Sequence, residues 1–252
     1  MPVEPINDGL EPEDNQSAIW RFMNLEKFSD MIRSRELYFC RADLFKDESE
    51  GMPPEKHVLN VSMNTQERNH LVGTIAQYRQ GFFVNCWHLF VEETARMWRD
   101  YGQAGVAVCS RYSLLKKALD SCRGRALIGL VRYGFQRWTR WNLIQFVMTK
   151  DEQYSHEREV RAVFWFPEYM GEGNRHFDEH NNAYPLPLTD SLDAPRYQRF
   201  RVDLQSLVTE IAVSPFAPES LLCEVEQLVS ESGLSIPVRL SELAQYKHVV
   251  LP

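Results

Sequence analysis

Residues 156–166 read His-Glu-Arg-Glu-Val-Arg-Ala-Val-Phe-Trp-Phe, passing from charged to β-branched and aromatic residues with no breaker before Pro167. Such a run predicts a β-strand. Alternate side chains of a strand share one face of its sheet. We therefore expect Glu157, Glu159 and Arg161 to project together, next to the aromatic end of the strand. The pattern favours a charged pocket set beside a core.

Outward from this strand, short apolar runs alternate with helix-like segments. We predict strands near 19–22, 36–41, 82–87, 106–109, 126–133, 200–204, 209–214 and 238–240, and helices near 25–34, 65–78, 92–101, 113–120 and 218–232. Residues 136–154 are ambiguous, and 167–199 are predicted to form one long irregular connection. Because the alternation lacks βαβ regularity, we predict an α+β fold with a mixed, mainly antiparallel sheet and flanking helices.

The first 17 residues are rich in Pro, Glu, Asp and Asn, which predicts a flexible leader, and residues 18–252 are expected to form a single α+β domain. The 252 residues carry a formal charge of −7, which argues against broad affinity for nucleic acid or anionic membranes. The five cysteines form no C-x-x-C pair, so buried thiols are expected. We predict no metal site, no signal peptide and no membrane contact, hence a cytoplasmic protein.

Six short motifs occur in a fixed order along the chain. They are Ile19–Phe22 with the helix that follows, Glu36–Arg41 with Phe45, Phe83–His88, Met97–Gly102, Gly105–Val108 and His156–Arg161. Over residues 18–245 the ordered set resembles the bacterial domain of unknown function family 2971 (DUF2971). That family has no generally assigned activity, so the resemblance implies a shared fold and no particular reaction.

A looser resemblance is to ADP-ribosyltransferases, which often carry an Arg or His on an early strand, small polar residues on a central strand and a catalytic Glu on a late strand. Arg21 matches the first position, and Glu159 matches the last, with Glu157 completing a Glu-x-Glu pattern. Residues 85–88 depart from the central pattern. This resemblance implies NAD or a nucleotide as a possible substrate, no permanently bound cofactor, and a role suited to a toxin or phage-defence effector.

The same resemblance implies a role for each charged residue. Glu159 would stabilise the positive charge that develops on a ribose as nicotinamide leaves, and Glu157 would orient or deprotonate the acceptor. Arg161 would hold Glu157 or a phosphate, and Arg21, which stands between two aromatic residues, would recognise a phosphate or carboxylate. The alternative is a structural ion-pair ladder in which Arg21 pairs with one of the acidic residues.

His88, Trp98 and Tyr101 are further candidates for binding the ligand. Same-face residues on a strand stand too far apart for direct contact, so His88 is expected to be a polar pocket residue instead of forming a catalytic pair or metal site with Cys86. Trp98 and Tyr101 belong to one helical stripe. Such stripes usually pack in a core, although either ring could stack on a base or nicotinamide.

Residues 132–141 interleave aromatic residues with Arg132, Arg137 and Arg140. Arginines can neutralise phosphates while aromatic rings such as Trp138 stack on unpaired bases. Given the negative net charge, we favour an amphipathic segment whose aromatic residues pack while the arginines face water. Three functions follow in order of preference: an ADP-ribosyltransferase-like enzyme, a non-catalytic sensor of a nucleotide or RNA end, and a scaffold that binds a partner.

Overall fold

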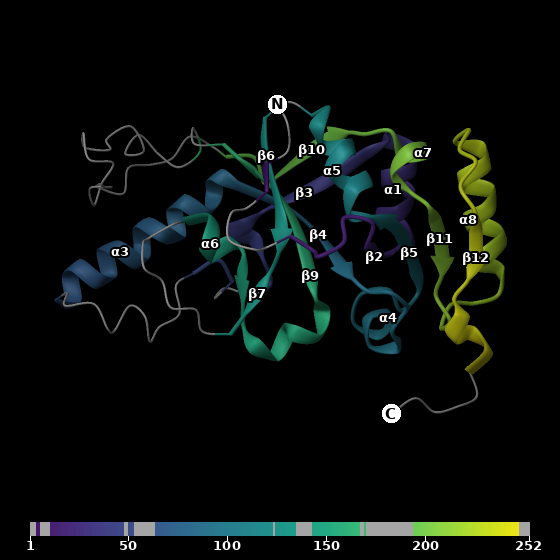
Figure 1. The fold of residues 1–252 in the computed structure, drawn as a ribbon, viewed down its shortest axis with the longest axis horizontal. Helices are drawn as coiled ribbons and strands as arrows, with labels where there is room; N and C mark the ends of the chain where they lie inside the picture. Colours follow the sequence, from purple (N-terminus) through teal and green to yellow (C-terminus); the bar gives the residue numbers. More distant parts are fainter. Residues whose placement is uncertain are drawn as a thin grey trace.

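A computed structural model describes residues 4–5, 11–47, 50–52, 64–122, 124–134, 143–166, 169 and 194–246 (Figure 1). The main sheet has the order β1 (Glu4–Pro5), β6 (Arg125–Leu130), β9 (Glu159–Trp165), β4 (Phe82–Leu89), β2 (Ala18–Asn24), β5 (Gly105–Arg111), β11 (Glu210–Val213), β12 (Val238–Leu240). Within it, only β1–β6 and β11–β12 pair in parallel among the described residues. The predicted α+β class with a mixed, mainly antiparallel sheet is confirmed.

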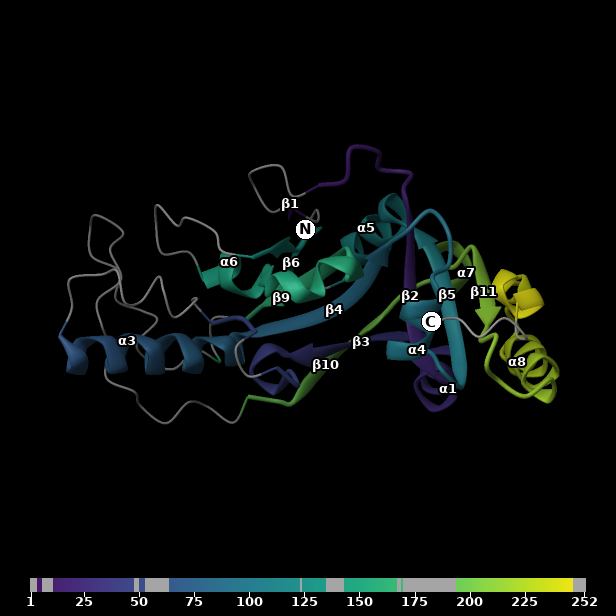
Figure 2. The ribbon, with the colours of Figure 1, turned by 90° about the horizontal axis from the view of Figure 1, so that it is seen from below.

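The sheet forks at β4. The first half of β4 pairs with β3 (Glu36–Arg41), which in turn pairs with β10 (Tyr197–Arg201), whereas its second half pairs with β2. Figure 2 shows β2 and β5 running across the direction of β4 and β3. Two side chains bridge the opening between the diverging strands: Asn85 Nδ2 donates to the Tyr38 carbonyl at 2.8 Å, and Arg21 Nη2 donates to the same oxygen at 3.4 Å. The fork therefore places Arg21 beside the middle of β4.

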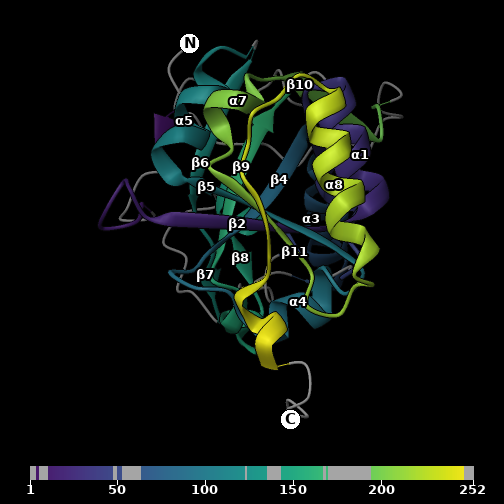
Figure 3. The ribbon, with the colours of Figure 1, turned by 90° about the vertical axis from the view of Figure 1, so that its right-hand side faces the viewer.

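Four helices cover one face of the sheet and form the larger core. They are α1 (Leu25–Ser34), α5 (Tyr112–Asp120), α7 (Leu204–Leu207) and α8 (Ser220–Glu231). Figure 3 shows α8 beside α1. Val160, Ala162 and Phe164 of β9 project into this core, so Glu159, Arg161 and Val163 face the other side of the sheet.

On that other side the strands are covered in two places. Over β2 and β5 lies α4 (Ala95–Tyr101), whose Met97 and Trp98 are buried against Trp20 and Phe22. Next to β4 and β9 lie α3 (Thr65–Tyr78), α6 (Leu143–Val147), and the short elements η1 (Ala42–Leu44) and η2 (Arg79–Gly81). The short η6 (Glu242–Tyr246) follows β12. The charged end of β9 lies on this same side of the sheet.

The prediction of a strand from His156 onward is wrong at its start. Residues Glu152–Glu157 form the 3-10 helix η3, and Arg158 has the left-handed φ of 44°, so β9 begins at Glu159. The predicted strand 126–133 is also divided, because β6 ends at Leu130 and β7 (Arg132–Tyr133) pairs with β8 (Thr149–Lys150) in a separate parallel ribbon. The segment between β6 and β9, which includes β7, β8 and η3, therefore carries Lys150 and Glu157.

Two parts of the predicted leader contact the domain: β1 pairs with β6, and Glu11 forms an ion pair with Lys116 at 3.1 Å. Most of the connection predicted over 167–199 lies outside the described residues. No helix in the described part of the chain combines the length and apolar character needed to cross a membrane.

Candidate functional site

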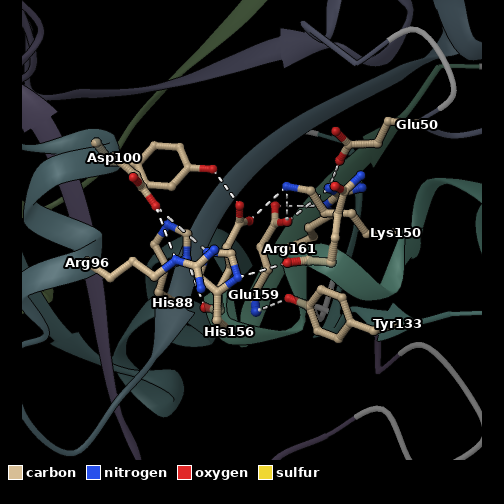
Figure 4. A network of polar contacts seen from close by, with 12 residues as sticks. Glu50, His88, Arg96, Asp100, Tyr133, Lys150, His156, Glu159 and Arg161 are labelled. Carbon is tan, nitrogen blue, oxygen red and sulfur yellow. Dashed lines mark hydrogen bonds and ion pairs between the residues drawn. The ribbon is translucent and has the colours of Figure 1, made fainter. Parts of the chain in front are cut away.

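Glu159 and Arg161 lie side by side on β9, as their spacing predicts (Figure 4). Arg161 Nε and Nη2 donate to the two oxygens of the Glu159 carboxylate at 2.8 and 3.0 Å. Both side chains are buried. A two-point contact of this kind is among the stronger hydrogen-bonded ion pairs in proteins, and it fixes the orientation of both groups.

The remaining donors of Arg161 are also occupied. Its Nη2 pairs with Glu50, its Nη1 donates to the Val147 carbonyl, and the ring of Phe45 lies 5.3 Å from the guanidinium carbon. Burial lowers the pKa of this guanidinium to about 9. Arg161 therefore holds Glu159 and Glu50 where the sequence predicted Glu157 or a phosphate. We call Glu50, Lys150, Glu157, Glu159 and Arg161 the carboxylate cluster.

Glu157 joins the cluster from η3 and not from the strand. The left-handed residue Arg158 turns the chain between the 3-10 helix and β9. One oxygen of the Glu157 carboxylate accepts from Tyr101 Oη at 2.6 Å, and the other accepts from Lys150 Nζ at 2.7 Å. Tyr101 is 42% exposed although its hydroxyl points inward, so it connects the buried Glu157 to the protein surface.

Lys150, on β8, bridges the two glutamates. Its Nζ lies 2.7 Å from Glu157 Oε2 and 3.4 Å from Glu159 Oε2, and 4.7 Å from the centre of the Tyr154 ring. Burial alone would lower the pKa of this ammonium, but the Glu159 and Glu157 carboxylates outweigh it and raise the pKa above its ordinary value. The two carboxylates therefore favour the protonated, cationic form of Lys150. Lys150 is not among the predicted site residues, because no local sequence pattern distinguishes a lysine on a two-residue strand.

Glu159 has two further neighbours. Its backbone N–H donates to Tyr133 Oη at 2.7 Å, and its carboxylate accepts a hydrogen bond from the Cys86 thiol. Burial raises the pKa of Glu159, against the opposing effect of Lys150. Burial and the adjacent Glu159 both raise the pKa of Cys86, which disfavours the nucleophilic thiolate form. Tyr133 was not among the predicted site residues.

His88 is buried between the cluster and α4. Its Nδ1 lies 3.0 Å from the Glu157 carbonyl, and because a carbonyl only accepts, Nδ1 carries the proton of the neutral ring. Burial lowers the pKa of His88 to about 4. The ring centre lies 5.4 Å from that of Tyr101 and 6.1 Å from that of Phe22. The prediction of His88 as a polar residue of the site fits these contacts.

Arg21 occupies the fork next to β4 and is partly exposed. In the described part of the chain no carboxylate lies within 4 Å of its guanidinium, so the predicted ion pair with Glu157, Glu159 or Asp43 is not formed there. Burial lowers the pKa of Arg21 to about 10, and the guanidinium is within electrostatic range of Cys86. Since Cys86 also hydrogen-bonds Glu159, Arg21 and Glu159 both adjoin this residue.

Of the two aromatic candidates on α4, Tyr101 alone reaches the site surface. Trp98 is fully buried, its Nε1 donates to Glu93 at 2.9 Å, and its ring packs edge-on against Phe22 at 5.0 Å. The prediction of Trp98 as a ligand-binding residue is therefore wrong, because neither face of its ring is accessible.

The described chain includes only the first part of the arginine-aromatic stretch. Arg137, Trp138 and Arg140 lie outside the described residues. Arg132 belongs to β7, where it is half-buried and its backbone N–H donates to the Met148 carbonyl at 2.9 Å. Among the described residues no group of three or more His, Cys, Asp and Glu side chains has the arrangement of a metal site.

No protein-family model, curated protein or solved structure matches this chain. Glu159 and Arg161 form a buried ion pair in which both carboxylate oxygens accept hydrogen bonds from the guanidinium. Glu157, Lys150 and Tyr101 form a hydrogen-bonded group that reaches the surface, and Arg21 lies nearby with no carboxylate partner in the described chain.

Proposed function

We propose that the protein binds a small nucleotide or NAD-like molecule at the surface formed by β2, β4, β9 and α4, and that it acts as an ADP-ribosyltransferase-like enzyme. The observation that carries the proposal is that Arg21, with no carboxylate within 4 Å among the described residues, lies within electrostatic range of His88, which in turn contacts Glu157 and Tyr101.

Arg21 is the best group for the ligand's phosphates. A guanidinium recognises phosphate through paired donors, and within the described chain Arg21 donates one long hydrogen bond, 3.4 Å, to the Tyr38 carbonyl. A phosphate at this position would bring the negative charge that no described carboxylate supplies.

Glu157 is the better candidate for the reacting carboxylate, although the Glu-x-Glu pattern favoured Glu159. Both oxygens of Glu159 are held by Arg161, which is itself anchored to Glu50. Glu157 is held by Tyr101 and Lys150, and a ribose hydroxyl could replace the exposed tyrosine's hydroxyl. A carboxylate placed there would stabilise the positive charge that develops on a ribose as its leaving group departs.

Binding and turnover of NAD by the purified full-length chain test the proposal. Arg21→Ala should weaken binding at least about tenfold in calorimetry, because a hydrogen bond to a charged group contributes about 1.5–3 kcal/mol. Arg33→Ala, on the exposed last turn of α1, is the matched control and should bind as the parent does. Glu157→Gln should abolish nicotinamide release while retaining binding.

Three results would decide between the functions. Release that depends on Glu157 supports the enzyme. Binding that depends on Arg21 without any release would replace the enzyme by a non-catalytic sensor. Absence of binding of NAD, ADP-ribose and AMP alike would overturn the proposal and leave the carboxylate cluster as a structural network.

A further inference from the structure

Two tyrosines form an exposed stacked pair at the edge of the sheet. Tyr38 of β3 and Tyr197 of β10 have ring centres 5.1 Å apart and an interplanar angle of 29°, and they are 37% and 46% exposed. The guanidinium carbon of Arg199 lies 5.9 Å from the centre of the Tyr38 ring and 5.5 Å from that of Tyr197. Large aromatic surface is thus presented to solvent beside a cation.

The strand register places this pair next to the proposed site. Cys40 of β3 pairs with Val84 of β4, and Tyr38, two residues before Cys40, projects to the same side of β3 as Cys40. Side chains opposite one another point to the same face of a sheet. Tyr38 and Cys86 therefore share the face that carries Glu159 and Arg161, since Cys86 pairs with Arg161 on β9.

The separation suits a ligand of nucleotide size. Neighbouring strands lie about 4.8 Å apart, so β3 and β9 are separated by roughly 10 Å where both pair with β4, at Phe83 and Val84, and by more beyond the fork. Arg21 contacts the backbone oxygen of Tyr38 itself, which places a phosphate-binding group within one side chain's length of the stacked rings. A base on the tyrosines and a phosphate on Arg21 can therefore belong to one molecule.

We infer that Tyr38 and Tyr197 form a base-stacking subsite for the nucleotide whose phosphate binds Arg21. This inference rests on the proposed function and deepens it, because it restricts the ligand to molecules that carry an aromatic base. Every base presents a π-face, so stacking on two tyrosines gives affinity with little discrimination among bases. Arg199 lies 2.9 Å from Asp30 and 3.7 Å from Glu36, and these two carboxylates offset its positive charge at the rim of this subsite.

A comparison of AMP with ribose 5-phosphate tests the subsite, because the two ligands differ by the base alone. The wild-type chain should bind AMP at least about tenfold more tightly than ribose 5-phosphate in calorimetry. Tyr197→Leu and Tyr38→Leu should each remove most of that difference and leave the affinity for ribose 5-phosphate unchanged. Phe216→Leu, a change at another exposed aromatic residue, is the control and should alter neither affinity.

The outcomes separate this inference from the function on which it rests. Equal wild-type affinities for the two ligands, or leucine variants that keep the full preference for AMP, would overturn the subsite while leaving phosphate binding at Arg21 intact. No binding of either ligand would overturn both proposals. If the leucine variants fail to fold, the ring-proton resonances of the two tyrosines in the wild type decide. AMP should shift them and ribose 5-phosphate should not, and unchanged resonances with bound AMP would refute the subsite.

Discussion

Replacing Arg161 by Met should lower the free energy of unfolding by about 3–5 kcal/mol, because it removes one partner of a buried ion pair and leaves the others uncompensated. Two carboxylates, Glu159 and Glu50, and the Val147 carbonyl lose their shared donor. Met retains most of the apolar volume, so cavity formation adds little. The loss is therefore mainly electrostatic.

The lower half of this range is expected, because Lys150 remains 3.4 Å from Glu159. For a domain of this size, 1 kcal/mol corresponds to about 2–4 °C in melting temperature, so the variant should melt roughly 6–16 °C below the parent. Glu159→Leu should lower the free energy of unfolding by a similar amount, since it removes the carboxylate that accepts two hydrogen bonds from the buried Arg161 guanidinium. The double variant should lose less free energy of unfolding than the two single variants together, because removing both charges leaves neither partner of the pair buried without the other.

Urea unfolding of the parent, both single variants and the double variant gives the coupling energy directly. The exposed pair formed by Arg96 and Asp100, 3.6 Å apart, supplies the control: Arg96→Met should cost less than about 1 kcal/mol. If Arg161→Met costs no more than that control, or if the two buried substitutions are additive, the argument for a structural role of this buried pair is refuted. Glu159 would then be available for catalysis as the Glu-x-Glu pattern suggested.

Three further perturbations test the structure around the site. The unfolded chain protonates His88 near pH 6.5 but the folded chain only near pH 4, so unfolding free energy should fall by about 3 kcal/mol as the pH drops between these values. His88→Asn should flatten that slope in denaturant titrations. Gly105→Ala should cost about 1–3 kcal/mol, because its Cβ would lie 2.1 Å from the Met23 carbonyl; an unchanged melting temperature would contradict the close β2–β5 approach. Asn24→Ala should cost about 1 kcal/mol by removing the cap on the Lys27 N–H, and Asn24→Asp should retain it in the same melting assay.

Sequence patterns predict a helix or strand correctly where the residues of that segment determine its conformation. The sequence predicts α1 with Asn24 as its N-cap, and the structure has both. The strands around Phe83 and Val108 are likewise found, because each contains an unbroken run of apolar residues, and the predicted strand at Val238–Leu240 is found as well. The residues 85–88 that departed from the ADP-ribosyltransferase pattern do lie on a strand of the site.

Contacts between segments far apart in the chain do not follow from local sequence patterns. Glu157 was predicted beside Glu159 because both were assigned to one strand, yet it arrives there through the left-handed turn at Arg158. Non-glycine residues rarely adopt this conformation, so sequence patterns gave no reason to expect it. Lys150 and Tyr133 reach the cluster from the β7–β8 ribbon. The fork at β4, which positions Arg21, depends on pairing between segments far apart in the chain.

The charges in the site restrict how a ligand can lie in it. The carboxylate cluster holds three acidic groups, Glu50, Glu157 and Glu159, against two cations, Lys150 and Arg161. With all three carboxylates ionised it has an excess of negative charge, and a phosphate placed against Glu157 would be repelled. Arg21, in contrast, has no carboxylate within 4 Å among the described residues. In the proposed binding mode the anionic end of the ligand therefore lies at Arg21, and a neutral or cationic group lies at Glu157. A free phosphate satisfies only the first requirement, whereas a nucleotide whose ribose carries a cationic leaving group satisfies both.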